Sequence, residues 1–192
     1  MRGRQDVRVP PEVAGACVDG TTFRSVMGAF PSGVTVVTTL GTGGAPLGVT
    51  CSATCSVSLD PPLLLVCLNR NSRVLSALVD RGQFIVNFLR DSRENTSSLF
   101  ASSTADRFAS AVWEPSRRGG LPLLVADSIA HAQCEVVGVI DAGDHTIVIG
   151  AAVDGNVHDD ALGPLLYWRR RYGRWPAEDD TRTIALTLAA EG

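Results

Sequence analysis

Apolar and polar residues alternate along the C-terminal half of the chain. From Ile129 onward the apolar positions fall on one face and the polar ones on the other: Ala130, Cys134 and Val136 against His131, Gln133 and Glu135. Such alternation predicts a half-buried β-strand. The sequence DAGD at 141–144 then predicts a tight turn into a long partner strand over His145–Val153.

Further apolar runs predict strands over residues 34–40, 47–50, 63–68 and 84–89, and a final pair around 165–168 and 172–175. The run Leu63–Leu68 contains no charged residue and predicts a strand buried on both faces. Nineteen Gly and ten Pro indicate many turns, which favours a β-rich architecture over a helical bundle.

Three short helices are expected between these strands. Thr21 or Thr22 is predicted to cap the first, which carries Phe23, Val26, Met27 and Phe30 and ends at Pro31 and Gly33. Asn71 or Ser72 is predicted to open the second, which Gly82 closes. Asp91 and Glu94 have the spacing of a capping box for the third, which ends near Phe100.

The length of 192 residues, 45% of them hydrophobic, suits one domain with a sizeable core. Residues 1–20 show no periodicity and are predicted to form a flexible N-terminal tail. Residues 21–176 then form the domain, and residues 177–192 a C-terminal extension. We expect a mostly β, barrel-like unit with a few short helices.

All seventeen basic residues are Arg, so no lysine is available for a Schiff base or for a nucleotide-binding P-loop. The formal net charge of −3 argues against nucleic acid as a partner. The run Arg169–Arg171 is interpreted as a solvated strand end rather than a phosphate grip.

The five cysteines at 17, 51, 55, 67 and 134 are odd in number and form no zinc-binding spacing, so no metal site is expected. The N-terminus has no signal-like apolar stretch, and no apolar run is long enough to span a membrane. These features predict a cytoplasmic protein with free thiols.

The segment Gly48–Pro62 is rich in Gly, Ala, Ser, Thr and Cys. Such small residues let backbone N–H groups and hydroxyls approach a flat polar ligand, although a simple bend would have the same composition. The segment from Gly41 lacks the G-x-G-x-x-G pattern of dinucleotide-binding folds. The motifs of serine hydrolases and zinc proteases are also absent.

Several motifs, in order along the chain, give a specific resemblance. They are FPSGVTVVTT at 30–39, GVTCSATCSVSLDPPLLLVCL at 48–68, NRNSR at 69–73, GQFIVNFL at 82–89, DRF at 106–108, GDHTIVIGAAV at 143–153 and PLLYWRRRYGRW at 164–175. Together they resemble the short-chain flavin reductases, the reductase components of two-component flavin-dependent monooxygenases.

That resemblance implies an FMN-binding split β-barrel of Greek-key type, a homodimer, and reduction of FMN or FAD by NADH or NADPH. The implied flavin-ring contacts come from the small-residue segment and a second wall: Thr50, Cys51, Ser52, Cys55, Ser56 and Val57, with Pro31, Ser32, Gly33 and Val34. Hydride transfer requires orientation of the two rings rather than a nucleophile or a metal.

The flavin phosphate is expected at Asn69, Ser72 and Arg73, because the start of a helix favours an anion. The alternative is that Ser72 only caps the helix and Arg73 is solvated. By resemblance, His145 is the candidate catalytic residue on the nicotinamide side, Arg107 and Phe108 contact the cofactor, and Tyr172 covers the pocket.

The predicted function is thus an NAD(P)H:flavin oxidoreductase that supplies reduced flavin to a partner monooxygenase. Two alternatives stay open: a non-enzymatic flavin- or haem-binding module, and an oxidase related to the pyridoxamine-phosphate oxidases. No role is assigned to His131 or His158. Arg117 and Arg118 are candidates for recognising a 2′-phosphate, and the sequence leaves the choice between FMN and FAD open.

Overall fold

The computed structural model describes residues 4–104, 106–158 and 162–175. The predicted C-terminal extension, 177–192, lies outside the described residues. The helical elements are α1 (Pro11–Ala14), α2 (Gly20–Gly28), η1 (Thr42–Gly44), α3 (Arg73–Arg81), α4 (Glu94–Ala101) and η2 (Val125–Asp127). The strands are β1 (Gln5–Val7), β2 (Ser32–Gly33), β3 (Thr35–Leu40), β4 (Pro46–Cys51), β5 (Thr54–Leu59), β6 (Pro62–Asn69), β7 (Gln83–Leu89), β8 (Glu114–Pro115), β9 (Pro122–Leu123), β10 (Ser128–Ala142), β11 (His145–Val157), β12 (Leu165–Trp168) and β13 (Arg171–Arg174).

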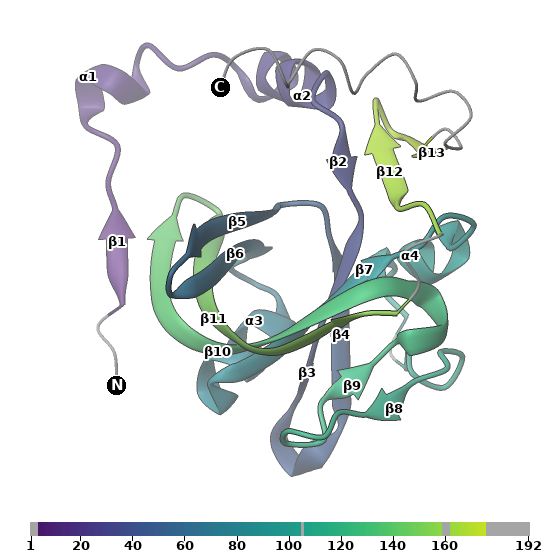
Figure 1. Cartoon of the computed structure of the whole chain (residues 1–192). Coiled ribbons are helices and arrows are strands. Elements are labelled where there is room, and N and C mark those ends of the chain that lie inside the picture. The colour runs from purple at the N-terminus through teal and green to yellow at the C-terminus, as the bar shows by residue number, and fades with distance from the viewer. Residues whose placement is uncertain (1–3, 105, 159–161, 176–192) are drawn as a thin grey trace, which may run out of the picture.

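One strongly curved sheet forms the body of the molecule, with strand order β4-β3-β7-β10-β11-β6-β5. Figure 1 shows the long strands β10 and β11 sweeping round it. No ladder joins the end strands β4 and β5, although the hydroxyls of Thr35 in β3 and Thr54 in β5 lie 3.2 Å apart. The expected mostly β barrel is confirmed.

The core fills the inside of this sheet. Alternate residues of β6 (Leu64, Val66 and Leu68) point inward and meet the apolar face of α3, formed by Val74, Leu75 and Leu78. A second cluster lies beneath α4, where Phe100 and Leu165 are fully buried. Together the clusters fix β4, β6 and the start of α3 relative to one another.

Helix α3 begins and ends as the sequence predicts. The Ser72 hydroxyl accepts a hydrogen bond from Val74 N–H at 3.2 Å and caps the N-terminus. Gly82, with φ of 77°, ends the helix in the left-handed conformation that glycine adopts without strain.

The other helix caps differ from the prediction. The N-cap of α2 is Asp19, whose carboxylate accepts hydrogen bonds from Thr21 and Thr22 N–H, so neither threonine caps the helix. Helix α4 has Arg93 at its N-cap with no side-chain cap bond, and the capping box of Asp91 and Glu94 does not form. Spacing alone misplaced these helix starts.

The predicted N-terminal tail contains regular structure. Strand β1 pairs in parallel with the end of β10, and Arg4 lies 2.7 Å from the Asp141 carboxylate. Helix α1 follows, and α2 already begins at Gly20. A three-residue strand and a four-residue helix are too short to give a recognisable apolar period.

Two burial predictions are also corrected. Leu63, Leu65 and Cys67 of β6 are only half-buried, so the strand is buried on one face. In β10 a bulge between Gln133 and Cys134 leaves both residues buried while Glu135 is exposed. The face predicted for His131, Gln133 and Glu135 is therefore not continuous.

Candidate active site

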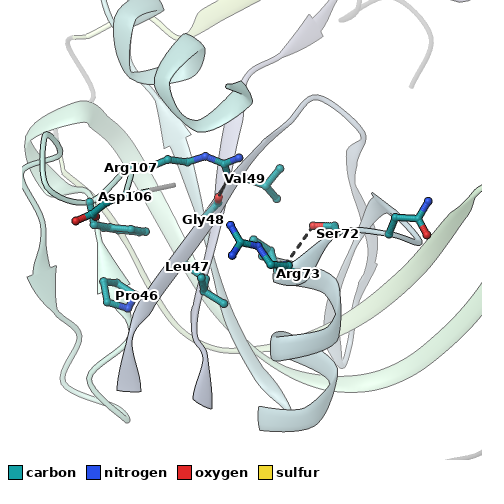
Figure 2. Close-up of a pocket in the computed structure, with 11 residues that line it drawn as sticks. Pro46, Leu47, Gly48, Val49, Ser72, Arg73, Asp106 and Arg107 are labelled. Carbon is teal, nitrogen blue, oxygen red and sulfur yellow. Dashed lines mark hydrogen bonds between the residues drawn. The ribbon is translucent and has the colours of Figure 1, made fainter. Parts of the chain in front are cut away.

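A cavity of about 250 Å³ opens between β4, the start of α3 and the segment 106–108. Figure 2 shows its lining, which consists of Pro46, Leu47, Gly48, Val49, Asn71, Ser72, Arg73, Val74, Asp106, Arg107 and Phe108. Four of the predicted cofactor contacts meet here: Ser72, Arg73, Arg107 and Phe108. The cavity has the size of a phosphate with part of its attached chain rather than of a whole flavin.

The start of α3 gives this cavity an anion-binding character. The first turn of a helix leaves backbone N–H groups unpaired, and the helix dipole adds positive potential there. Asn69 Oδ1 accepts from Asn71 N–H at 2.9 Å and fixes the loop that leads into the helix. Arg73, the first helical residue, places its guanidinium in the cavity beside Gly48 (Figure 2).

Arg107 approaches Gly48 from the other side of β4 (Figure 2). Its guanidinium donates to Gly48 O at 2.7 Å and to Ser102 O. Burial, and next the neighbouring charge of Arg73, lower the pKa of Arg107. Within the described chain, its Nε is buried without a hydrogen-bond acceptor. An anion between the two arginines would offset the repulsion between their charges, so the donor set fits a phosphate.

His145 lies at the neighbouring end of the sheet. It opens β11 directly opposite Asn69, the last residue of β6. Its Nδ1 is 2.8 Å from an oxygen of Asp144, and its ring is about half exposed. This contact lowers the pKa of Asp144. The predicted nicotinamide-side residue and the predicted phosphate loop are thus adjacent.

The small-residue segment divides between core and surface. The Cys51 thiol is buried, donates to Cys67 O at 3.5 Å, and has a pKa raised by burial. The Thr50 hydroxyl donates to Ser97 O at 2.6 Å. These two side chains are therefore committed to contacts within the protein. Ser52 is exposed in the turn between β4 and β5.

Cys55, Ser56 and Val57 lie on β5, at the edge of the sheet, and all three are exposed. Cys55 stands opposite Leu65, and the register shifts at a bulge between Ser56 and Ser58. The structure does not bring these residues into the cavity beside Arg73. Among the predicted contacts of the small-residue segment, these three lie beyond Ser52, on the edge strand β5.

The predicted second wall, Pro31–Val34, runs beside the small-residue segment. Ser32 and Gly33 form β2, which pairs with Tyr167 and Leu166 of β12. Ser32 and Ser52 line one cavity of about 310 Å³. Val34 is buried, so its side chain belongs to the core.

The two predicted aromatic contacts have structural roles as well. Phe108 is 9% exposed and packs edge-on against Phe100 and Trp113, with ring centroids 5.0 and 5.8 Å away. The Tyr172 hydroxyl lies 3.0 Å from that of Ser97, and its ring lines an apolar cavity together with Pro31. Phe108 thus packs in the aromatic cluster and also lines the candidate phosphate cavity.

Gly48 and Asn71 were missed as site residues although they lie inside quoted motifs. A Cβ on Gly48 would stand 2.7 Å from Phe100 Cε1, so only glycine lets β4 pass between the aromatic cluster and the cavity. The sequence did offer a signal for Gly48, since this glycine opens the small-residue segment. Its role could not be predicted, because it depends on packing against Phe100, which is distant in sequence.

Arg117 and Arg118 do not join the site. Arg118 lies 3.6 Å from Glu135, and its carbonyl accepts from the Gln133 amide. Arg117 lines a separate cavity with His131 and His158, whose ring nitrogens are 3.0 Å apart. That cavity shares no lining residue with the one at Arg73.

No group of three or more His, Cys, Asp or Glu side chains in the described part of the chain is arranged to hold a metal ion. In the same part, every helix is too short or too polar to cross a membrane.

Comparisons with known proteins agree with this geometry. A curated relative, "Flavin reductase (NADH)" from Kitasatospora aureofaciens, is 58% identical over 188 residues, which are 98% of each chain. A second, "Flavin-dependent monooxygenase, reductase subunit HsaB" from Mycobacterium tuberculosis, is 38% identical over 82% of this chain and 83% of its own.

Among solved structures, the NADH:FAD oxidoreductase SgcE6 of Streptomyces globisporus, in complex with NAD and FAD fragments, superposes with a TM-score of 0.78 at 32% identity. The match covers 91% of this chain and 99% of that one. The sequence profile of the family described as "Flavin reductase like domain" matches residues 27–176. Because that region spans most of the chain, this protein belongs to the flavin reductase like domain family.

Proposed function

We propose that this protein is an NAD(P)H:flavin oxidoreductase that reduces FMN or FAD and releases the reduced flavin to a partner flavin-dependent monooxygenase. The observation that carries the proposal is the cationic cavity at the start of α3. There Arg73 and Arg107 line one cavity, and burial and then the charge of Arg73 lower the pKa of Arg107. A flavin phosphate would neutralise these two adjacent positive charges.

The remaining residues have roles that follow from their places. Ser52 and Ser32 offer hydroxyls and backbone groups where the two predicted walls meet. A bound flavin supplies the two-electron acceptor, and donors beside its pyrimidine edge stabilise the charge that hydride arrival brings. His145, exposed and adjacent to Asn69, orients the nicotinamide. The relative from Kitasatospora favours NADH as the reductant.

The protein acts as a homodimer in this proposal. Leu63, Leu65 and Cys67 of β6 pair with Ala151, Ile149 and Ile147 of β11, and these six side chains face away from the core. All of them are half-buried in the single chain. A second copy covering this apolar face would complete the burial that the unbroken apolar run Leu63–Leu68 predicts.

The absence of disulfides among the five cysteines supports a cytoplasmic location.

The experiment is NADH and NADPH oxidation by the full chain, followed at 340 nm with FMN, FAD or riboflavin as acceptor. We expect turnover that depends on added flavin. Tight flavin retention without oxidation of either reductant would instead identify a non-enzymatic flavin-binding module. Absence of both binding and turnover would refute the proposal.

A further inference from the structure

Three arginines gather on a groove between α2 and the turn that joins β12 to β13. Two adjoining cavities, of about 510 and 310 Å³, are both lined by Arg24, Gly28, Arg169 and Arg170. The smaller one extends to Ser32 and Ser52, where the flavin ring is proposed to lie. Neither cavity shares a residue with the one at Arg73. The molecule therefore has a second cationic site beside the proposed ring site.

The turn that carries two of these arginines is fixed against the end of α2, as Figure 1 shows for the hairpin and the helix. Trp168 Nε1 donates to Ala29 O at 3.0 Å, and Arg169 N–H donates to Gly28 O at 3.3 Å. The Arg169 guanidinium stacks 4.7 Å from the centre of the Trp168 ring. These contacts hold the arginines toward the groove rather than leaving them as a loose strand end.

The backbone of this turn is unusual for its residues. Arg169 and Arg170 have φ of 48° and 62° and form the two-residue turn between Trp168 and Arg171. Such a turn favours Asn-Gly, because the left-handed conformation crowds a Cβ atom. Two consecutive arginines in this turn therefore lower the stability of the fold relative to Asn-Gly. Strain of this kind is typical of positions retained for binding.

The charge of the groove is not neutralised within the described part of the chain. There, no carboxylate oxygen comes within 4.0 Å of a guanidinium nitrogen of Arg24, Arg169 or Arg170. No acidic residue lines either cavity. Phe30 and Trp168, 69% and 47% exposed, line the smaller one. Cations beside exposed aromatic rings suit a ligand that carries both phosphate and a flat heterocycle.

We propose that this groove binds the pyrophosphate and adenosine of the nicotinamide dinucleotide reductant. The inference rests on the proposed function. The flavin phosphate has its own anchor at Arg73, so a second cationic site that opens on the ring site serves the second phosphorylated ligand. Arg24, Arg169 and Arg170 contact the pyrophosphate, and Phe30 or Trp168 stacks on the adenine.

The test uses the double variant Arg169→Asn/Arg170→Gly, which removes both charges and installs the residues that the turn conformation prefers. Steady-state KM values are measured for NADH, for reduced nicotinamide mononucleotide, which lacks the adenylate, and for FMN and FAD. Inhibition by ADP-ribose and thermal unfolding are measured alongside. Arg174→Gln, on the same hairpin but outside both cavities, is the matched control.

In the double variant we expect the KM for NADH and the inhibition constant of ADP-ribose to rise about tenfold or more. A rise of this size corresponds to the loss of one charge-assisted hydrogen bond to the pyrophosphate. The KM for the mononucleotide and the KM values for both flavins should stay at their wild-type values, and the melting temperature should not fall. Unchanged NADH and ADP-ribose constants would overturn the proposal. A rise confined to FAD would also overturn it, since the groove would then hold the flavin's adenylate.

Failure of the proposed function would look different. The wild-type chain would then oxidise no NADH with any flavin, whereas ADP-ribose binding by calorimetry would still test the groove without turnover.

Discussion

Asn69 and His145 face each other across the antiparallel pair of β6 and β11, one at the end of its strand and the other at the start. Three residues beyond Asn69, Ser72 caps α3. The predicted phosphate loop and the predicted nicotinamide-side histidine therefore belong to one rigid corner of the sheet. Since β6 and β11 are fixed by core packing of Val66 and Val148, the corner is set before any ligand binds.

His145→Asn is expected to lower kcat with NADH by about tenfold to 100-fold, because productive hydride transfer depends on the orientation of the nicotinamide. The KM for flavin should stay unchanged. Stopped-flow reduction of the flavin under anaerobic conditions measures the step directly. Asp144→Ala, which removes the 2.8 Å contact to Nδ1 and leaves the imidazole in place, is the control and should have the smaller effect. Wild-type reduction by His145→Asn would contradict the assignment.

Arg73→Gln is expected to raise the KM for FMN about tenfold, the loss of one charge-assisted hydrogen bond to phosphate. Turnover with riboflavin, which has no phosphate, should be unaffected, and that ratio is the diagnostic measurement. Arg81→Gln, at the other end of α3 and bonded to Gly119 O, is the control. Equal losses with FMN and riboflavin would place the phosphate elsewhere.

Gly48→Ala should destabilise the fold by about 1–3 kcal/mol, the usual cost of overpacking, because the new Cβ would stand 2.7 Å from Phe100. Denaturant unfolding measures the change. Gly173→Ala, whose Cβ would meet nothing within 4 Å, should change stability by less than about 0.5 kcal/mol. Similar losses for the two variants would mean that Phe100 does not confine β4.

Asp141 should make stability depend on pH. Its hydrogen bonds with Arg4 and then Thr146 lower the pKa of the carboxyl below the ordinary 3.8 in the folded state. Its contribution is therefore complete above the unfolded pKa and is lost as pH falls through the folded pKa. We expect Asp141→Asn to lower the melting temperature at neutral pH and to approach wild type near pH 3. Asp6→Asn, at the exposed pair with Arg8, should show no such dependence.

Ile149→Asp should convert the proposed dimer to a monomer, because it places a charge at the centre of the outward apolar face of β6 and β11. Sedimentation velocity measures the state, and flavin turnover should fall with dissociation. Leu65→Gln, its cross-strand neighbour, provides a milder second variant, with circular dichroism as the check on folding. A monomeric wild type, or dimeric variants of full activity, would exclude this interface.

The sequence predicted the strands well because each has a clear apolar pattern. It predicted α3 well because Ser72 and Gly82 cap the two ends of that helix. It overestimated the burial of Leu63–Leu68, because Leu63, Leu65 and Cys67 have no cover within the described chain. Phe23, Val26, Met27 and Phe30 of the first helical segment are all at least half exposed. Apolarity predicts that a surface will be covered, but not which chain covers it.

The motifs predicted which segments form the candidate site. They did not predict which side chains of those segments point into the core and which line a cavity. Cys51 lies in a small-residue run, yet its thiol is in the core, since a strand alternates faces regardless of composition. The meeting of Arg24 with the 169–170 turn depends on contacts between segments about 140 residues apart, which no local pattern encodes.

Strand β10 changes neighbours along its length, and this has a consequence for its dynamics. Residues 130–135 have ladder partners on both β7 and β11, whereas residues 140–142 depend on the three-residue strand β1 for one edge. Deuterium uptake should therefore be slow at residues 130–135 and faster at residues 140–142. The sheet should open first at the end of β10 that pairs with the N-terminal strand β1.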